Sequence, residues 1–132
     1  MYPFFSIIIP VYNSEKYLEV CLNSILKQSF SDYEILIIND SSKDRSKNIC
    51  NDFKRTSSKI KIIENKKNLG VSLSRNKGIK NSSGKYIIFL DSDDILVPGS
   101  LKKLHHYILL TKTNIIVLKH NELKNNYKNS IK

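Results

Sequence analysis

No run of eighteen or more apolar residues occurs in the sequence, so no part of it is expected to span a membrane. The first ten residues carry no basic region ahead of their apolar run, which is unlike a signal peptide. Cysteine is scarce, and Cys21 and Cys50 stand far apart without the Cys-x-x-Cys spacing of metal and redox motifs. Both fall in segments with a helical pattern, so we expect buried free thiols in a reducing compartment, the cytoplasm.

Two glycine-rich phosphate-binding motifs are also absent. A dinucleotide fold needs Gly-x-Gly-x-x-Gly after its first strand, but Pro10, Val11, Tyr12 and Asn13 stand there. The P-loop pattern Gly-x-x-x-x-Gly-Lys-Ser/Thr occurs nowhere in the chain. These absences disfavour dinucleotide-binding and P-loop enzymes.

Acidic residues are outnumbered, since 22 Lys and Arg face 12 Asp and Glu and the net charge is +10. The lysines are spread along the chain, and no nucleic-acid recognition motif accompanies them. We therefore expect no nucleic-acid partner. The charge is expected to attract anionic ligands, or an anionic membrane surface at the cytoplasmic face, weakly and in a salt-dependent way.

Short apolar runs alternate with segments of helical period. Strands are expected at residues 5–9, 33–38, 60–64, 85–90 and 114–118. Helices are expected over residues 17–26, 44–55, 72–80 and 100–111, the first of them capped by Asn13 or Ser14. This order predicts an α/β fold, a mainly parallel sheet with helices on both faces. Residues 1–118 are expected to form the domain, and residues 119–132 a polar, basic tail.

Polar residues stand where the predicted strands end. Asn13, Asp40 and Asp91 each follow the last apolar residues of a strand, and ligands of such sheets bind beyond the carboxyl ends of the strands. Asp40 could contact a ribose in a dinucleotide fold, which the missing glycine motif disfavours. Tyr12 could stack on a base, or it could simply pack as a partly buried aromatic residue.

Three acids crowd into the four residues Asp91-Ser92-Asp93-Asp94. Like charges this close repel, and a bound cation relieves the repulsion. Oxygen ligands without nearby Cys or His favour Mg²⁺ or Mn²⁺, which also bind phosphates. The cluster therefore predicts a metal that bridges to a diphosphate. The alternative is a solvated acidic loop in which Asp94 caps the next turn. Arg75 could hold a phosphate or brace the acids, or it could be a plain surface arginine.

Six segments, in this order, resemble the donor-binding portion of the family 2 glycosyltransferases. They are residues 6–13 (SIIIPVYN), 24–29 (SILKQS), 34–44 (EILIINDSSKD), 68–70 (NLG), 74–78 (SRNKG) and 84–94 (GKYIIFLDSDD). The resemblance covers about residues 4–118. Two positions depart from the family's pattern, because the family usually has Asp where Asn39 stands and Gly where Ser42 stands.

The resemblance implies a Rossmann-like GT-A fold that binds a nucleotide-diphospho-sugar, with a UDP-sugar favoured, and a divalent metal, Mn²⁺ or Mg²⁺. It implies transfer of the sugar, with inversion, to a hydroxyl of a saccharide or lipid-linked acceptor. It assigns nucleotide-sugar binding to Pro10, Val11, Tyr12, Asn13, Asp40, Arg75, Asp91 and Ser92, and the metal to Asp93 with Asp91. Within that set Tyr12 and its neighbours would frame the base, Asp40 would bond to the base, and Arg75 would lie near the diphosphate.

The family's catalytic base comes well after the strand expected at residues 114–118. The resemblance therefore implies a base beyond Lys132, and no residue of this sequence is assigned that role. Two hypotheses follow. The chain is the donor-binding portion of a glycosyltransferase, or it is a catalytically incomplete binding or scaffold module that needs a partner chain. Either way, an uncovered sheet edge and apolar surface predict self-association.

Overall fold

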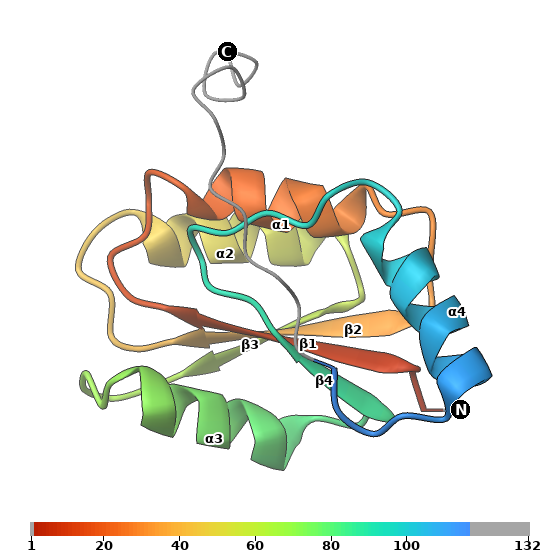
Figure 1. Ribbon diagram of the computed structural model, residues 1–132. Helices are drawn as coiled ribbons and strands as arrows, with labels where there is room; N and C mark the ends of the chain where they lie inside the picture. The colour runs from red at the N-terminus through yellow and green to blue at the C-terminus, as the bar shows by residue number, and fades with distance from the viewer. Residues whose placement is uncertain (1, 117–132) are drawn as a thin grey trace.

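The computed structural model describes residues 2–116, in which strands and helices alternate as the apolar pattern predicts. The elements are, in order, β1 Phe5–Val11, α1 Leu18–Leu26, β2 Tyr33–Asn39, α2 Ser46–Thr56, β3 Ile60–Glu64, α3 Val71–Asn81, β4 Tyr86–Phe89 and α4 Ser100–Thr111 (Figure 1). None of the described helices is both long and apolar enough to cross a bilayer.

The described strands form one parallel sheet in the order β3-β2-β1-β4 (Figure 1). Helices α1 and α2 cover one face and α3 covers the other, as Figure 1 shows. The central strands β1 and β2 are apolar almost throughout because both of their faces are buried. The predicted α/β architecture with helices on both faces is confirmed.

The side chains of successive residues in β1 point alternately to the two faces of the sheet. Ile7 and Ile9 belong to the large core that α1, α2 and α4 cover, whereas Ile8 belongs to a smaller cluster on the other face. A side-chain carbon added at Gly78 of α3 would collide with the Ile8 side chain. Glycine at position 78 therefore lets α3 pack closely on the sheet.

Three local predictions were wrong. The first strand continues to Val11, because Pro10 lacks only its own N–H and the Val11 carbonyl still accepts the Asp40 N–H at 2.8 Å. Neither Asn13 nor Ser14 caps α1, which begins at Leu18 after a turn. Residues 114–116 are not in a strand, and residues 117–118 of that predicted strand and the predicted tail 119–132 lie outside the described residues.

Candidate functional site

A cleft of about 420 Å³ opens where the carboxyl ends of β1, β2 and β4 meet. Its lining comprises Pro10, Val11, Tyr12, Asp40, Asn68, Gly70, Val71, Ser74, Arg75, Asp91, Ser92 and Asp93. The strand order reverses here, because β1 is flanked by β2 on one side and by β4 on the other. The fold thus brings every predicted site residue except Asn13 into one cleft.

Asp40 is the most enclosed acidic residue of the cleft, with 3% of its surface exposed. Its Oδ1 accepts hydrogen bonds from Asn65 Nδ2 at 2.8 Å and Leu69 N at 2.9 Å, and its Oδ2 accepts one from Gly70 N at 2.8 Å. Burial by itself would raise the pKa of Asp40, but these hydrogen bonds and one from Ser74 outweigh it and hold the pKa below the ordinary value. Asp40 is therefore an anion that ties the loop before α3 to the sheet.

Arg75 and Asp91 form an ion pair in the cleft. The distance from Arg75 Nη2 to Asp91 Oδ1 is 2.6 Å, and the guanidinium lies 5.8 Å from the centre of the Phe89 ring. The Nε atom of Arg75 is buried and has no hydrogen-bond partner. The geometry favours the bracing role for Arg75, and it holds a guanidinium where a phosphate entering the cleft would meet it.

The acidic segment after β4 folds as a tight turn. The Asp94 N–H donates to the Asp91 carbonyl at 3.0 Å, and Asp93 is exposed at the cleft. Asp94 does not cap α4, which begins at Ser100 with Gly99 in the capping position. Among residues 2–116, no group of three or more Asp, Glu, His or Cys converges on a point where an ion could sit.

Helix α1 and Gln28, which follows it, anchor the loop after β4, a role that sequence reasoning did not assign. Cys21 donates a weak S–H hydrogen bond to the Asp91 carbonyl at 3.6 Å. Ser24 Oγ accepts the Leu96 N–H at 3.0 Å, and Gln28 Nε2 donates to the Val97 carbonyl at 3.0 Å. A signal was present, because Ser24 and Gln28 are polar residues within one of the six segments, but only the fold shows what they hold.

Both cysteines are buried and free, as predicted. Burial, followed by the negative charges of Asp94, Asp93 and Asp91, raises the pKa of the Cys21 thiol to about 12. Cys21 is consequently a neutral thiol beneath the acidic segment, and thiolate chemistry is excluded there near neutral pH.

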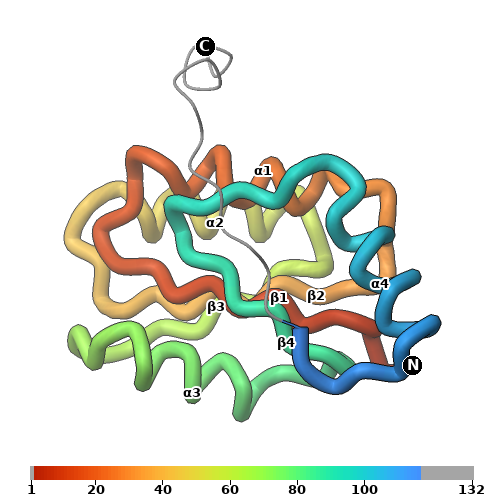
Figure 2. The backbone as a smooth tube through the Cα atoms, in the orientation of Figure 1, coloured from red at the N-terminus to blue at the C-terminus, as the bar shows by residue number. Residues whose placement is uncertain are grey.

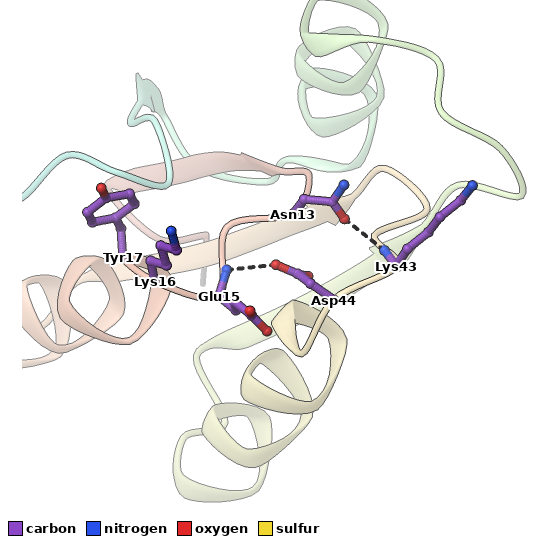
Figure 3. A pocket seen from close by; sticks show the side chains of 6 residues that line it. All are labelled: Asn13, Glu15, Lys16, Tyr17, Lys43 and Asp44. Carbon is purple, nitrogen blue, oxygen red and sulfur yellow. Dashed lines mark hydrogen bonds between the residues drawn. The ribbon is translucent and has the colours of Figure 1, made fainter.

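Asn13 lies outside the cleft, in a neighbouring hollow of about 470 Å³ (Figure 3). It adopts a left-handed backbone conformation with φ of 48°, and its Oδ1 accepts the Lys43 N–H at 2.8 Å. Beside it, the Glu15 N–H donates to Asp44 Oδ2 at 3.0 Å, and the Arg45 N–H donates to Glu15 Oε2 at 2.9 Å. Asn13 therefore helps to join the loops after β1 and β2, and its predicted contact with nucleotide stays a prediction.

The structure also explains the two departures from the family's pattern. Asn39 Nδ2 donates to Glu64 Oε2 at 2.8 Å while its Oδ1 accepts the Ser42 N–H at 3.3 Å. An aspartate at position 39 would place a second carboxylate against Glu64, whereas the amide supplies the donor. The left-handed conformation falls on Ser41, with φ of 61°, so position 42 does not require glycine.

The family model for glycosyl transferase family 2 matches residues 6–128. Glycosyltransferase GlyA of Streptococcus pneumoniae is 40% identical over 112 residues, which are 85% of this chain and 16% of that protein. The uncharacterized glycosyltransferase EpsJ of Bacillus subtilis is 41% identical over 104 residues, 79% of this chain and 30% of that protein. The chain spans between 16% and 30% of the length of these two relatives.

Among solved structures, the chain is similar to S. aureus TarS 1–349. The two superpose with a TM-score of 0.78 and are 32% identical, over 85% of this chain and 33% of that one. TarS 1–349 has also been solved in complex with UDP and with UDP-GlcNAc.

Proposed function

The chain belongs to glycosyl transferase family 2, and we propose that it forms the part of a transferase that binds a nucleoside-diphosphate sugar. The observation that carries the proposal is the cleft at the strand-order reversal, which places Tyr12, Arg75, Asp91 and Asp93 around one space. Such a cleft offers an aromatic face for a base, a guanidinium for phosphate and carboxylates for a cation.

A UDP-sugar is the donor that we favour. The support comes from TarS, which is 32% identical to this chain and has been solved with UDP and UDP-GlcNAc. In our proposal the uracil lies against Tyr12, whose side chain is 45% exposed, and beside the Asp40 carboxylate. That carboxylate already accepts hydrogen bonds from Asn65, Leu69, Gly70 and Ser74, so an N–H of the base would share or displace one of them.

The donor set of the cleft fits a hard divalent cation carried by the diphosphate. Asp91 and Asp93 supply only oxygen ligands, and Mg²⁺ or Mn²⁺ typically takes one or two carboxylates and completes its shell with phosphates and water. We propose Asp93, which is exposed, as the principal ligand, with Asp91 beside it. The ion, when bound, supplies Lewis acidity toward the leaving diphosphate, while Arg75 orients the phosphates.

The reaction that we propose is attack of an acceptor hydroxyl, of a saccharide or a lipid-linked glycan, on the anomeric carbon with inversion. A carboxylate base with a pKa near neutrality would take the hydroxyl proton. Asp40 is buried as a stabilised anion and Asp91 is paired with Arg75, so neither has the environment of such a base. We assign the base to no residue from 2 to 116.

Metal-dependent UDP binding is the test of this function. We expect the chain to bind UDP at least about tenfold more tightly with Mn²⁺ or Mg²⁺ than in EDTA, because the ion joins the diphosphate to Asp93. Isothermal titration calorimetry with UDP, and with GDP for comparison, measures this difference. Equal affinity with and without metal would contradict the metal assignment, and absence of UDP and GDP binding would contradict the proposed function.

Replacing Asp40 by alanine is expected to weaken UDP binding by about tenfold or more while leaving the ratio of affinities with and without metal unchanged. Removal of the carboxylate leaves the Leu69 N–H without its acceptor and the Gly70 N–H with only Asn68 Oδ1, so hydrogen exchange at Leu69 above all should accelerate. Calorimetry and amide exchange measure the two effects, and Asp52→Ala, on the exposed side of α2, is the control. Wild-type UDP affinity in Asp40→Ala would show that the uracil does not contact Asp40.

A further inference from the structure

We propose that Ser14 and Ser92 couple the two halves of the cleft. Their hydrogen bond joins the loop after β1, where Tyr12 would receive the nucleoside, to the acidic segment Asp91–Asp94, which would hold the metal. We infer that the first loop positions the second segment through this bond. The inference rests on the function proposed above and adds two positioning residues to it. The loop after β4 runs beside the loop after β1 (Figure 2), and the hydroxyl oxygens of Ser92 and Ser14 lie 2.7 Å apart.

The direction of the hydrogen bonds follows from counting hydrogens. Ser14 Oγ also lies 3.2 Å from the Tyr12 carbonyl, to which it donates. A serine hydroxyl has one hydrogen, so Ser14 donates its hydrogen bond to the Tyr12 carbonyl and accepts one from the Ser92 hydroxyl. A relay therefore runs from Ser92 through Ser14 to the backbone of Tyr12, and consecutive hydrogen bonds of this kind polarise one another.

Ser14 is held independently of Ser92. Its N–H donates to Ser46 Oγ, at the start of α2, at 2.8 Å, and its carbonyl accepts the N–H groups of Tyr17 and Leu18. Only 9% of its surface is exposed. Ser14 is thus held in place by the loops after β1 and β2, and its hydroxyl joins both of them to the loop after β4.

Ser92 stands between the two proposed metal ligands. Asp91 precedes it and Asp93 follows it, so the Ser92 side chain fixes the segment on one side while Arg75 holds Asp91 on the other. A base pressed against Tyr12 would restrain the Tyr12 carbonyl, and through Ser14 and Ser92 it would narrow the range of positions open to both carboxylates. Occupancy of the base site should consequently favour metal binding, and the effect should be reciprocal.

The first test measures the coupling factor, the ratio of UDP dissociation constants without and with saturating Mn²⁺. The direct contact between metal and diphosphate remains in every variant, so Ser14→Ala should lower this factor by about fivefold, the equivalent of one neutral hydrogen bond, without abolishing it. Ser92→Ala should have the same effect. The double variant should lose no more than either single one, because both substitutions remove one link. Ser92→Thr, which keeps the hydroxyl, should retain the wild-type factor.

Ser82→Ala is the matched control. It removes a hydroxyl that donates to the Ile79 carbonyl at 2.7 Å, after the end of α3, and should leave the coupling factor unchanged. An unchanged factor in Ser14→Ala and Ser92→Ala, or losses that multiply in the double variant, would overturn the proposed link. Thermal melts identify a variant that is unfolded. Ser92 is half-exposed whereas Ser14 is buried, so Ser92→Ala should disturb the fold less than Ser14→Ala.

A second readout needs no metal. Uridine has no phosphate, so any influence it has on the acidic segment does not pass through a bound metal. Saturating uridine should slow hydrogen exchange of the Asp94 amide, which bonds to the Asp91 carbonyl at 3.0 Å, in the wild type but not in Ser14→Ala. Slowing that persists in Ser14→Ala would overturn the link. Failure of the wild type to bind uridine or UDP would contradict the proposed function instead.

Discussion

Alanine in place of Glu34 is expected to lower the free energy of unfolding by about 2–4 kcal/mol, because each donor that loses its acceptor costs about 1–3 kcal/mol. Glu34 is 6% exposed at the start of β2. Its carboxylate accepts hydrogen bonds from Ser6 Oγ at 2.6 Å, Ser83 N at 2.7 Å, Ser83 Oγ at 2.8 Å and Lys61 Nζ at 2.7 Å. Alanine would leave the Ser6 hydroxyl and the Ser83 N–H without this acceptor. Urea denaturation followed by circular dichroism measures the loss.

The same network predicts a specific loss of stability in acid. Burial acts to raise the pKa of Glu34, but the hydrogen bonds from Lys61, Ser6 and Ser83 prevail and lower it from 4.5 to about 2. A depressed pKa stabilises the fold fully above pH 4.5, and this contribution, about 3 kcal/mol, disappears as the pH falls toward 2. The stability difference between wild type and Glu34→Gln should therefore shrink between pH 5 and pH 2.

Glu19→Ala is the control for both measurements, because Glu19 is an exposed glutamate of α1. It should change the unfolding free energy by less than about 0.5 kcal/mol. A similarly small effect of Glu34→Ala, or a constant difference between wild type and Glu34→Gln across the acid range, would show that the carboxylate does not anchor the sheet.

Alanine at Asp93 is expected to remove the dependence of UDP affinity on Mn²⁺, a loss of about tenfold or more. Asp93 is exposed at the cleft, so its replacement should leave the unfolding free energy nearly unchanged. Calorimetry of UDP with Mn²⁺ and in EDTA, on the same preparation, separates the contribution of the metal to UDP affinity from the contribution of the protein alone. In EDTA the variant should bind UDP as the wild type does.

The charge-matched control is Asp32→Ala. Asp32 is exposed and immediately precedes β2, at the opposite end of the strands from the cleft. Asp32→Ala changes the net charge by the same amount as Asp93→Ala, so a long-range electrostatic effect on UDP affinity would appear in both variants. A metal effect that survives in Asp93→Ala would mean that the ion binds other ligands.

Much of the fold and the membership of the cleft could be predicted from sequence. Apolar runs such as residues 33–38 and helical periods such as residues 100–111 report their local conformation directly, because backbone geometry sets the spacing of buried side chains. In a parallel sheet the carboxyl ends of the strands meet at one edge, so Tyr12, Asp40 and Asp91 could be grouped before their distances were known.

Only the tertiary structure decided which polar atoms meet within that group. Ser14 and Ser92 are 78 positions apart, and their contact depends on strand order and on the path of two loops. The same holds for Gln28, which bonds to the Val97 carbonyl from 69 positions away. A sequence pattern shows which residues of one helix or strand are buried. It does not show which residue of another element a polar side chain will bond to. The sequence by itself therefore determined the elements and the chemistry at the strand ends, whereas the partners of Asn13, Asp40 and Ser14 were decided by three-dimensional packing.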